Sequence, residues 1–397
     1  MVIRCIFIIL FFTGCAKFTS TPPIKSEDKK KINLTAVSFE QVLGWKTDNH
    51  HQAFKTFLRS CSKILSSTST GKLVLGHNFV NKVKLQKICK KAIRTDVKRT
   101  REGTRLFFER WFQLYQVSDG YNKTGLFTGY YEPLLRGSRS KTLKYNVPIY
   151  RRPSDLVSVD LGTHRSNWSG RQISGRLSGK KLIPYFSRRA IDGGALEGKG
   201  LEIFWVDNAI DAFFLHIQGS GRILLNTGEM VRVGFAGRNG HPYFAIGRDL
   251  VKRGTISKEG VSLQTIREWL EKNPKQAKEL MQKNRSYIFF KERKTLKKRV
   301  FSENGPIGAA GVSLTPGRSL AVDRKYYGMG LPIWIDTAHP LTNIPLRRLM
   351  VAQDTGGAIV GPIRGDFFWG YGDNAREAAG KMKHRGQLYI LSPRFVD

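Results

Sequence analysis

From Gly120 onward the sequence consists of short runs of β-branched and aromatic residues, separated by turns rich in glycine. Runs of about four to eight such residues, bounded by turn residues, are typical of β-strands. Many short strands joined by glycine-rich turns favour a barrel or a sandwich over other architectures. This part of the chain is therefore predicted to be mainly β.

Eleven runs in this part are read as strands. They span residues 126–131, 147–150, 202–206, 212–218, 222–225, 230–235, 286–290, 331–336, 346–352, 366–369 and 387–391. Asn-Thr-Gly-Glu at 226–229 predicts a hairpin turn between two of them. One helix is expected over 262–283, interrupted or restarted at Pro274.

The N-terminal third has helical patterns instead. Ser38 and Gln41 have the spacing of a capping box, which opens a helix. Apolar residues then recur at helical intervals over 53–65, which places Cys61 on the face toward a core. Two further helical patterns cover 79–93 and 106–115.

The first fifteen residues resemble a bacterial lipoprotein signal. Arg4 precedes a short apolar run, and Thr-Gly-Cys follows at 13–15. This segment is too short for a membrane span, and no other apolar run reaches the roughly 18 residues that a spanning helix needs. We expect Cys15 to be the lipidated mature N-terminus, residues 16–35 to be a tether, and the protein to face the periplasm from the outer membrane. An ordinary signal peptide cleaved elsewhere is the alternative.

Cys61 and Cys89 remain once the leader is set aside. In an oxidising compartment they can form a disulfide, and two buried free thiols are the alternative. Neither has a histidine or a second cysteine at the spacing of metal ligands, so no zinc site is expected.

The chain has 67 Lys and Arg against 31 Asp and Glu, a formal net charge of +36. A charge of this sign suggests nucleic acid. The lysines are spread over the chain, however, and no nucleic-acid-binding motif accompanies them. We expect no nucleic-acid partner, and attraction to an anionic polymer outside the cytoplasm.

Three aspartates follow or open predicted strands near the C-terminus: Asp336, Asp354 and Asp366. A carboxyl group at a strand end can point into a cleft, where apolar neighbours raise its pKa. A single aspartate of this kind is more often a loop cap. Asp354-Thr355-Gly356 also matches the aspartic protease motif, but that enzyme needs two copies and this chain has one.

The three aspartate segments resemble the "3D" domain. Together with five other motifs they resemble the membrane-bound lytic murein transglycosylase A family over about residues 126–391. The five motifs are FTGYYEP at 127–133, IDGGA at 191–195, HIQGSG at 216–221, GFAGRNGHPY at 234–243 and GPIGAAG at 305–311.

The resemblance implies roles for individual residues. Asp366 matches the catalytic aspartate, and Asp354 and Asp336 match the two supporting aspartates. Glycan-binding residues of the family match Thr128, Tyr130, Tyr131, Gln218 and Ser220.

The resemblance also implies the fold, a mainly β protein with N-terminal helices. Residues 36–131 and 286–397 would form a double-psi β-barrel domain, and 132–285 an inserted second β-barrel-like domain. The peptidoglycan glycan strand would lie in a cleft between them. A monomer is expected.

The implied reaction needs no cofactor and no metal. One protonated aspartate would cleave the bond between N-acetylmuramic acid and N-acetylglucosamine without water and release 1,6-anhydromuramyl products. A hydrolytic muramidase, which needs a second carboxylate, is the alternative. A non-catalytic peptidoglycan-binding lipoprotein is a further alternative.

Overall fold

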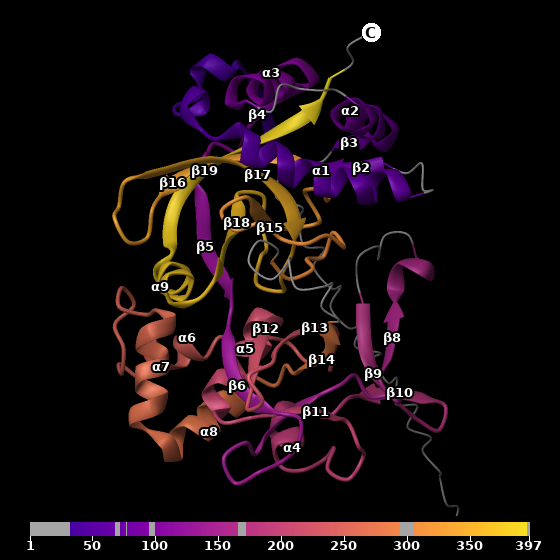
Figure 1. Ribbon diagram of the computed structural model, residues 1–397, viewed down its shortest axis with the longest axis vertical. Coiled ribbons are helices and arrows are strands. Elements are labelled where there is room, and N and C mark those ends of the chain that lie inside the picture. The colour runs from indigo at the N-terminus through magenta and orange to yellow at the C-terminus, as the bar shows by residue number, and fades with distance from the viewer. Residues whose placement is uncertain are drawn as a thin grey trace, which may run out of the picture.

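The computed structural model describes residues 32–67, 72–76, 78–94, 100–165, 172–293 and 305–394. The predicted signal segment, Cys15 and most of the predicted tether lie outside the described residues. Figure 1 shows two stacked units. The barrel unit comprises the described residues of 32–132 and 305–394, and the insert unit those of 134–293. β5 (Gly125–Glu132) runs from the first toward the second, where the chain continues as β6 (Leu134–Ser138).

Six strands of the barrel unit close into a ring. Going round it, the order is β5, β18, β15, β17, β16 and β19, and β19 bonds to both β16 and β5. β1 and β4 continue the sheet from β19. Their bounds are β1 Ile32–Val37, β4 Phe112–Asp119, β15 Ser319–Val322, β16 Pro332–Ala338, β17 Pro345–Asp354, β18 Arg364–Tyr371 and β19 Lys383–Pro393. Within the ring itself every strand is paired on both sides.

Three N-terminal helices cover the top of this barrel in Figure 1: α1 (His50–Ser66), α2 (Lys82–Arg94) and α3 (Arg101–Trp111). Phe57 of α1 packs edge-on against Phe108 and Phe112, with ring centroids 5.9 and 5.8 Å apart. All three rings are fully buried. A short two-stranded sheet, β2 (Lys72–Leu75) and β3 (Asn78–Asn81), lies between α1 and α2. The helices are therefore part of the barrel's hydrophobic core.

The insert unit has a six-stranded sheet in the order β14, β13, β12, β6, β11, β7. The new strands are β7 Val147–Tyr150, β11 Glu202–Val206, β12 Ser220–Leu225, β13 Met230–Arg238 and β14 Ile288–Arg293, and β8 Val157–Asp160, β9 Gln172–Ser178 and β10 Lys181–Pro184 form a separate sheet. Its helices are α4 Arg188–Asp192, α5 Ala209–Gln218, α6 Ile246–Lys252, α7 Leu263–Lys272 and α8 Pro274–Lys283. The predicted hairpin at 226–229 is confirmed, because β12 and β13 pair antiparallel across it.

The prediction of a strand at 212–218 is wrong, because these residues belong to α5. Asn208 caps this helix by accepting the N–H groups of Ile210 and Asp211, and Gly219 ends it with a φ of 75°. The segment is apolar on nearly every side, and a buried helix of this kind has no periodicity that separates it from a buried strand.

Three boundaries also differ from expectation. Residues 32–35 belong to β1, which pairs with β4, rather than to a tether. The helical patterns at 79–93 and 106–115 each include a strand, at 79–81 and from Phe112 onward. β14 pairs with β13, so the chain leaves the insert unit after Arg293 and not near residue 285. Within the part of the chain that the structure describes, no helix is long and apolar enough to cross a membrane.

Candidate active site

Four neighbouring strands of the barrel place two aspartates on one face. Ala321 of β15 is paired with Asp354 of β17 on one side and with Asp366 of β18 on the other. Thr128 of β5 is the next residue in the row, opposite Asp366. Adjacent strands are about 4.8 Å apart, so the two aspartate backbones lie about 10 Å from each other. Ala321 between them is small and buried.

Asp366 is held through one oxygen only. Its Oδ1 accepts a hydrogen bond of 2.5 Å from the Thr128 hydroxyl, and that hydroxyl accepts one of 2.8 Å from Arg364 Nη2. Among the described residues, Asp366 Oδ2 has no protein partner, and the side chain is partly exposed. Burial raises the pKa of Asp366, and the Arg364 charge and the Thr128 hydroxyl oppose that rise. This carboxyl group therefore has an open oxygen and an increased tendency to hold a proton.

Asp354 is held through both oxygens. Its Oδ1 accepts the backbone N–H groups of Ala309 and Thr355, each at 3.0 Å, and its Oδ2 accepts the Tyr130 hydroxyl at 3.0 Å. Burial raises the pKa of Asp354 to about 6 even though these three donors favour the charged form. Asp354 is thus fixed in position by the protein itself.

The Tyr130 side chain contacts Asp354 through its hydroxyl and Phe368 through its ring. Its ring packs on Phe368, with centroids 5.1 Å apart. Burial, together with the charges of Asp354 and Asp366, raises the pKa of Tyr130 well above its usual value. The hydroxyl therefore stays protonated and acts as a donor.

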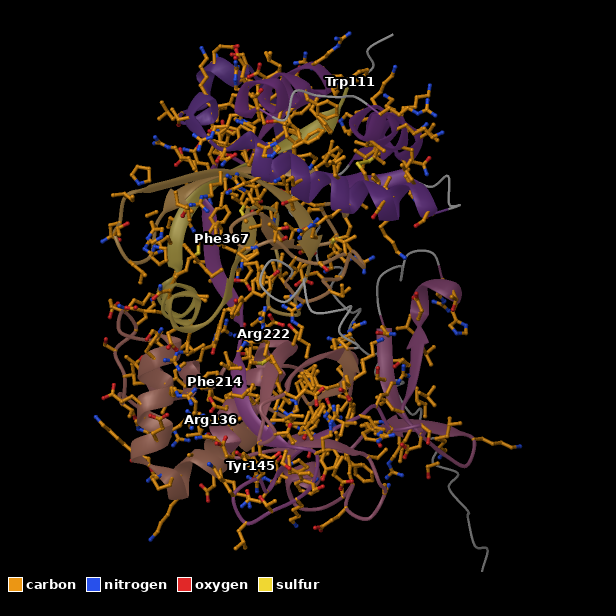
Figure 2. All side chains as sticks on the ribbon, in the orientation of Figure 1. Trp111, Arg136, Tyr145, Phe214, Arg222 and Phe367 are labelled. Carbon is orange, nitrogen blue, oxygen red and sulfur yellow. A yellow bond between two sulfur atoms is a disulfide. The ribbon has the colours of Figure 1, made fainter. Side chains whose placement is uncertain are left out.

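Of the three aromatic residues after Asp366, only Phe368 shares its face of β18. Side chains alternate along a strand, so Phe367 and Trp369 point to the opposite face. Their rings pack against each other at 4.5 Å within the barrel core, and the Trp369 indole N–H donates to Met382 Sδ. Figure 2 shows Phe367 inside the barrel unit.

Asp336 is not brought to the other two aspartates. It lies opposite Arg347 in the β16–β17 pairing and accepts a 3.0 Å bond from Arg347 Nε. Asp354 is seven residues farther along β17, which is about 23 Å at the rise of a strand. The structure therefore separates Asp336 from the site that Asp354 and Asp366 form.

Tyr131 differs from its neighbour Tyr130. Its side chain is 5% exposed and packs on Ala375 and Ala379 of α9 (Asp373–Lys381), and burial raises its pKa to about 12. Its backbone N–H donates to Gln218 Oε1 at 3.2 Å. Tyr131 thus contacts the insert unit through its backbone while its ring stabilises the barrel unit.

Gln218 ends α5, and Ser220 begins β12 two residues later. The two units meet beside them. Arg222 Nε donates to the buried Glu132 at 2.8 Å, and the Arg222 guanidinium lies 3.6 Å from the Tyr371 ring centroid. Figure 2 shows Arg222 where the units join. Gln218 and Ser220 are therefore contributed by the insert unit next to the Asp366 strand.

Two residues that help to position the site aspartates, Arg364 and Ala309, were not predicted from the sequence. Arg364 precedes Asp366 by two positions, and residues two apart on a strand share a face, so its role could have been inferred from spacing. The Ala309 N–H left no signal in the sequence, because any residue but proline supplies this donor. In the described ranges, no three His, Cys, Asp or Glu side chains gather in a way that could hold a metal ion.

Family profiles match the chain in two places: the "MltA specific insert domain" at residues 126–291 and the "3D domain" at 318–392. Membrane-bound lytic murein transglycosylase A of Vibrio cholerae is 31% identical over 284 residues, which is 68% of this chain and 67% of that protein. A crystal structure of a membrane-bound lytic murein transglycosylase from Agrobacterium tumefaciens is 36% identical with a TM-score of 0.80, and the match covers 91% of this chain and 98% of that one.

The Escherichia coli enzyme with bound chitohexaose is 27% identical, with a TM-score of 0.58 over 79% of this chain and 84% of that one. These similarities extend over both units and over the strands that place Asp354 and Asp366. The chain therefore belongs to the membrane-bound lytic murein transglycosylase A family and is a peptidoglycan lytic transglycosylase.

Proposed function

We propose that this enzyme cleaves the β-1,4 bond between N-acetylmuramic acid and N-acetylglucosamine without water, with Asp366 as acid and then as base. The open Oδ2 of Asp366 is the observation that supports this assignment most directly. A general acid needs an oxygen within hydrogen-bond reach of the leaving group and a pKa near the working pH. Asp354, whose two oxygens both accept protein donors, is less suited to that task.

The reaction needs two proton transfers at one carboxyl group. Asp366 first donates its proton to the glycosidic oxygen as the bond from the muramic C1 breaks. The sugar's own 6-hydroxyl oxygen then bonds to C1, and its proton returns to Asp366. The products are a shortened glycan and a 1,6-anhydromuramyl end. No water is consumed, and Asp366 finishes in its starting state.

Thr128 and Arg364 hold Asp366 in place during both steps. Arg364 is fixed by donating from Nη1 to Gly365 O at 2.6 Å as well as to Thr128 from Nη2. Its charge stabilises the carboxylate that exists between the two transfers. We assign Asp354 the role of orienting Tyr130 beside that carboxylate.

We further propose that the glycan lies in a cleft between the two units. The closed ring of six strands supports a double-psi barrel as its upper side. Thr128, Tyr130, Gln218 and Ser220 would bind the sugars with hydroxyl and amide groups. Arg238 of the insert unit lies near Gly357 of the loop after Asp354, which supports an approach of the two units at this point.

A hydrolytic muramidase is the second candidate. Asp354 and Asp366 lie on the same face two strands apart, and an inverting glycosidase likewise needs a second carboxylate to activate water. The full set of donors on Asp354 argues against its acting as the base. A purely binding lipoprotein is disfavoured by the raised pKa of Asp366.

Digestion of purified sacculi in oxygen-18 water tests this proposal. Transglycosylation gives anhydro products without label, whereas hydrolysis in oxygen-18 water gives labelled muramic ends that are about 20 Da heavier. Asp366→Asn should lower turnover about 100- to 10,000-fold, the usual contribution of general acid–base catalysis. Asp373→Asn, an exposed carboxyl group on α9, is the matched control and should keep full turnover. Labelled products would assign the reaction to a muramidase.

Attachment to the outer membrane through lipid on Cys15 is proposed from the lipoprotein-like signal that ends in Thr-Gly-Cys at 13–15 and from the membrane-bound relatives. Several acyl chains on one residue are enough for stable anchoring. Cys15→Ala should release the protein from membranes or block its maturation. Normal maturation with unchanged membrane partitioning would contradict the lipid anchor.

A further inference from the structure

The insert unit has a half-open cavity of about 930 Å³ that takes no part in the proposed chemistry. It lies among α4, α5, α8 and β11, which Figure 1 shows in the lower unit. Its lining includes Asp192 from the IDGGA motif and His216 from the HIQGSG motif. Neither residue contacts Asp354 or Asp366, so the function proposed above leaves both motif positions unexplained.

Arg188 supplies a buried positive charge to this cavity. The residue is 4% exposed, and its guanidinium lies 5.0 Å from the ring centroids of both Phe213 and Tyr287. Its Nε and Nη2 donate to the backbone carbonyls of Asn284 and Ser286. Within the described ranges, Arg188 forms no ion pair and its Nη1 has no acceptor. Asp192 on the same helix acts on Arg188 through its charge without contacting it, so the guanidinium has no carboxylate bonded to it.

His216 supplies a second donor beside it. The residue is 7% exposed, and its ring centroid is 4.1 Å from that of Tyr287, which Arg188 also contacts. Its Nδ1 accepts the Ile288 N–H, so the hydrogen is on Nε2. No acceptor for this Nε2–H is present in the part of the chain that the structure describes. Burial and the nearby Arg188 charge lower the pKa of His216, which keeps the ring neutral.

Carboxylates line the same cavity on the side of Arg188. Asp192 lies one helical turn after Arg188 on α4, and Glu197 follows in the next loop. Asp192 accepts only a long bond of 3.4 Å from Gln282. The cavity therefore presents two unused N–H donors, which suit a carboxylate, and neighbouring carboxylates, which suit an ammonium group.

We propose that this cavity binds the free carboxyl end of a murein peptide stem, with Arg188 and His216 holding the carboxylate and Asp192 attracting an amino group. The identity of the peptide rests on the proposed function, because peptide stems accompany the glycan. The site would select where along a substituted glycan the enzyme acts.

Helix α5 gives this site a route to the glycan. Gln218 and His216 are two positions apart, which places them about 200° apart around the helix. Gln218 contacts β5 through Tyr131, and His216 faces the cavity. The helix between them is about 10 Å wide, and four extended peptide residues reach about 13 Å. A stem attached to a sugar near Gln218 could thus enter the cavity.

Calorimetry with the whole protein tests the proposal, with peptide stems released from sacculi by an amidase as the probe. His216→Asn keeps an acceptor near the position of Nδ1 and removes the Nε2–H donor. We expect it to bind the stems at least about tenfold more weakly, as loss of one hydrogen bond to a charged group implies. Methyl esters of the stems should bind about as weakly to the wild type. Lys272→Gln, on the exposed surface of α7, is the control and should bind normally.

The outcomes separate this inference from the proposed function. His216→Asn should still cleave glycan strands stripped of peptide, and Asp366→Asn should still bind stems. Asp192→Asn, which leaves the buried donors in place, should weaken binding of stems with a free amino group more than binding of N-acetylated stems. Wild-type protein that does not bind stems, or that binds acetate as well as it binds stems, would overturn the inference whether or not the enzyme cleaves glycan.

Discussion

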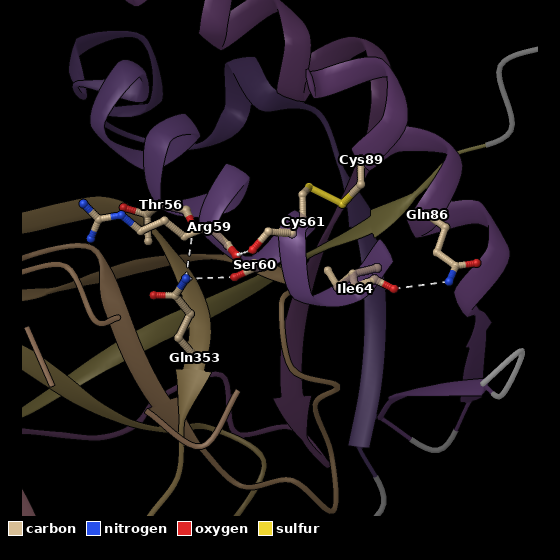
Figure 3. The surroundings of a disulfide bond; sticks show 9 residues. Thr56, Arg59, Ser60, Cys61, Ile64, Gln86, Cys89 and Gln353 are labelled. Atoms are coloured by element: carbon tan, nitrogen blue, oxygen red, sulfur yellow. Dashed lines mark hydrogen bonds between the residues drawn. A yellow bond between two sulfur atoms is a disulfide. The ribbon is translucent and has the colours of Figure 1, made fainter. Parts of the chain in front are cut away.

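Gln353 joins the N-terminal helices to the strand that ends in Asp354, as Figure 3 shows. It is fully buried, and its Nε2 donates to Thr56 O at 3.0 Å and to Ser60 Oγ at 2.8 Å, both on α1. Its Oε1 accepts the Ser319 hydroxyl at 2.5 Å. Replacing Gln353 with leucine keeps most of the volume and removes all three bonds.

The expected cost follows from these bonds. Each contributes about 0.5–1.5 kcal/mol net, so their loss should lower the free energy of unfolding by about 3 kcal/mol. The change should also reach the site, since the Gln353 carbonyl accepts the Ala310 N–H next to the Ala309 donor of Asp354. A displacement of about 1 Å can cost a site 100-fold in rate. We expect Gln353→Leu to lose about tenfold or more in turnover while still folded.

Urea unfolding followed by tryptophan fluorescence measures the stability, and release of soluble fragments from sacculi measures the turnover. Gln86→Leu is the matched control. This glutamine donates to Ile64 O and Ser67 O at the other end of α1, far from β17. The control should lose about 2 kcal/mol for its two bonds and keep its activity. An unchanged unfolding midpoint and unchanged turnover in Gln353→Leu would refute the argument.

Three further predictions concern titration and the disulfide. Arg364→Met removes a charge that lowers the pKa of Asp366, so the alkaline limb of the kcat/KM profile should move to higher pH; a shift to lower pH would contradict the role of Arg364. The structure pairs Cys61 with Cys89 across a separation of 28 residues, and the double alanine variant should lose about 3.5 kcal/mol in urea unfolding, as should reduced wild type. The pKa of Asp354, about 6, lies above its ordinary 3.8, so the stability it contributes is present below pH 3.8 and lost as pH rises through 6. As the pH rises from 4 to 8, the free energy of unfolding of Asp354→Asn, measured from urea midpoints, should therefore increase by about 2 kcal/mol relative to that of wild type. The same difference between the two proteins at both pH values would show that Asp354 does not titrate in this range.

Local patterns predicted most secondary structure correctly, and the exceptions have a common cause. The helix at 53–65 and the strand at 202–206 are each buried on one face, and their apolar residues therefore recur at the spacing typical of that element. The segment at 212–218 is buried on nearly all sides, so its periodicity is lost and its helical state depends on the Asn208 cap and on packing. The strand that starts at Phe112 directly continues a helix, and no glycine or proline marks the change.

By itself, the sequence determined the mainly β architecture, the candidate aspartates at strand ends and, through the order of its motifs, the family. These are properties of neighbouring residues or of short segments. The tertiary structure alone decided which distant residues meet. It placed Asp354 and Asp366 on either side of Ala321, placed Asp336 beside Arg347 instead, and left Arg188 and His216 lining a half-open cavity. Such meetings depend on strand register and helix packing between segments far apart in the chain, and no local pattern of residues records them.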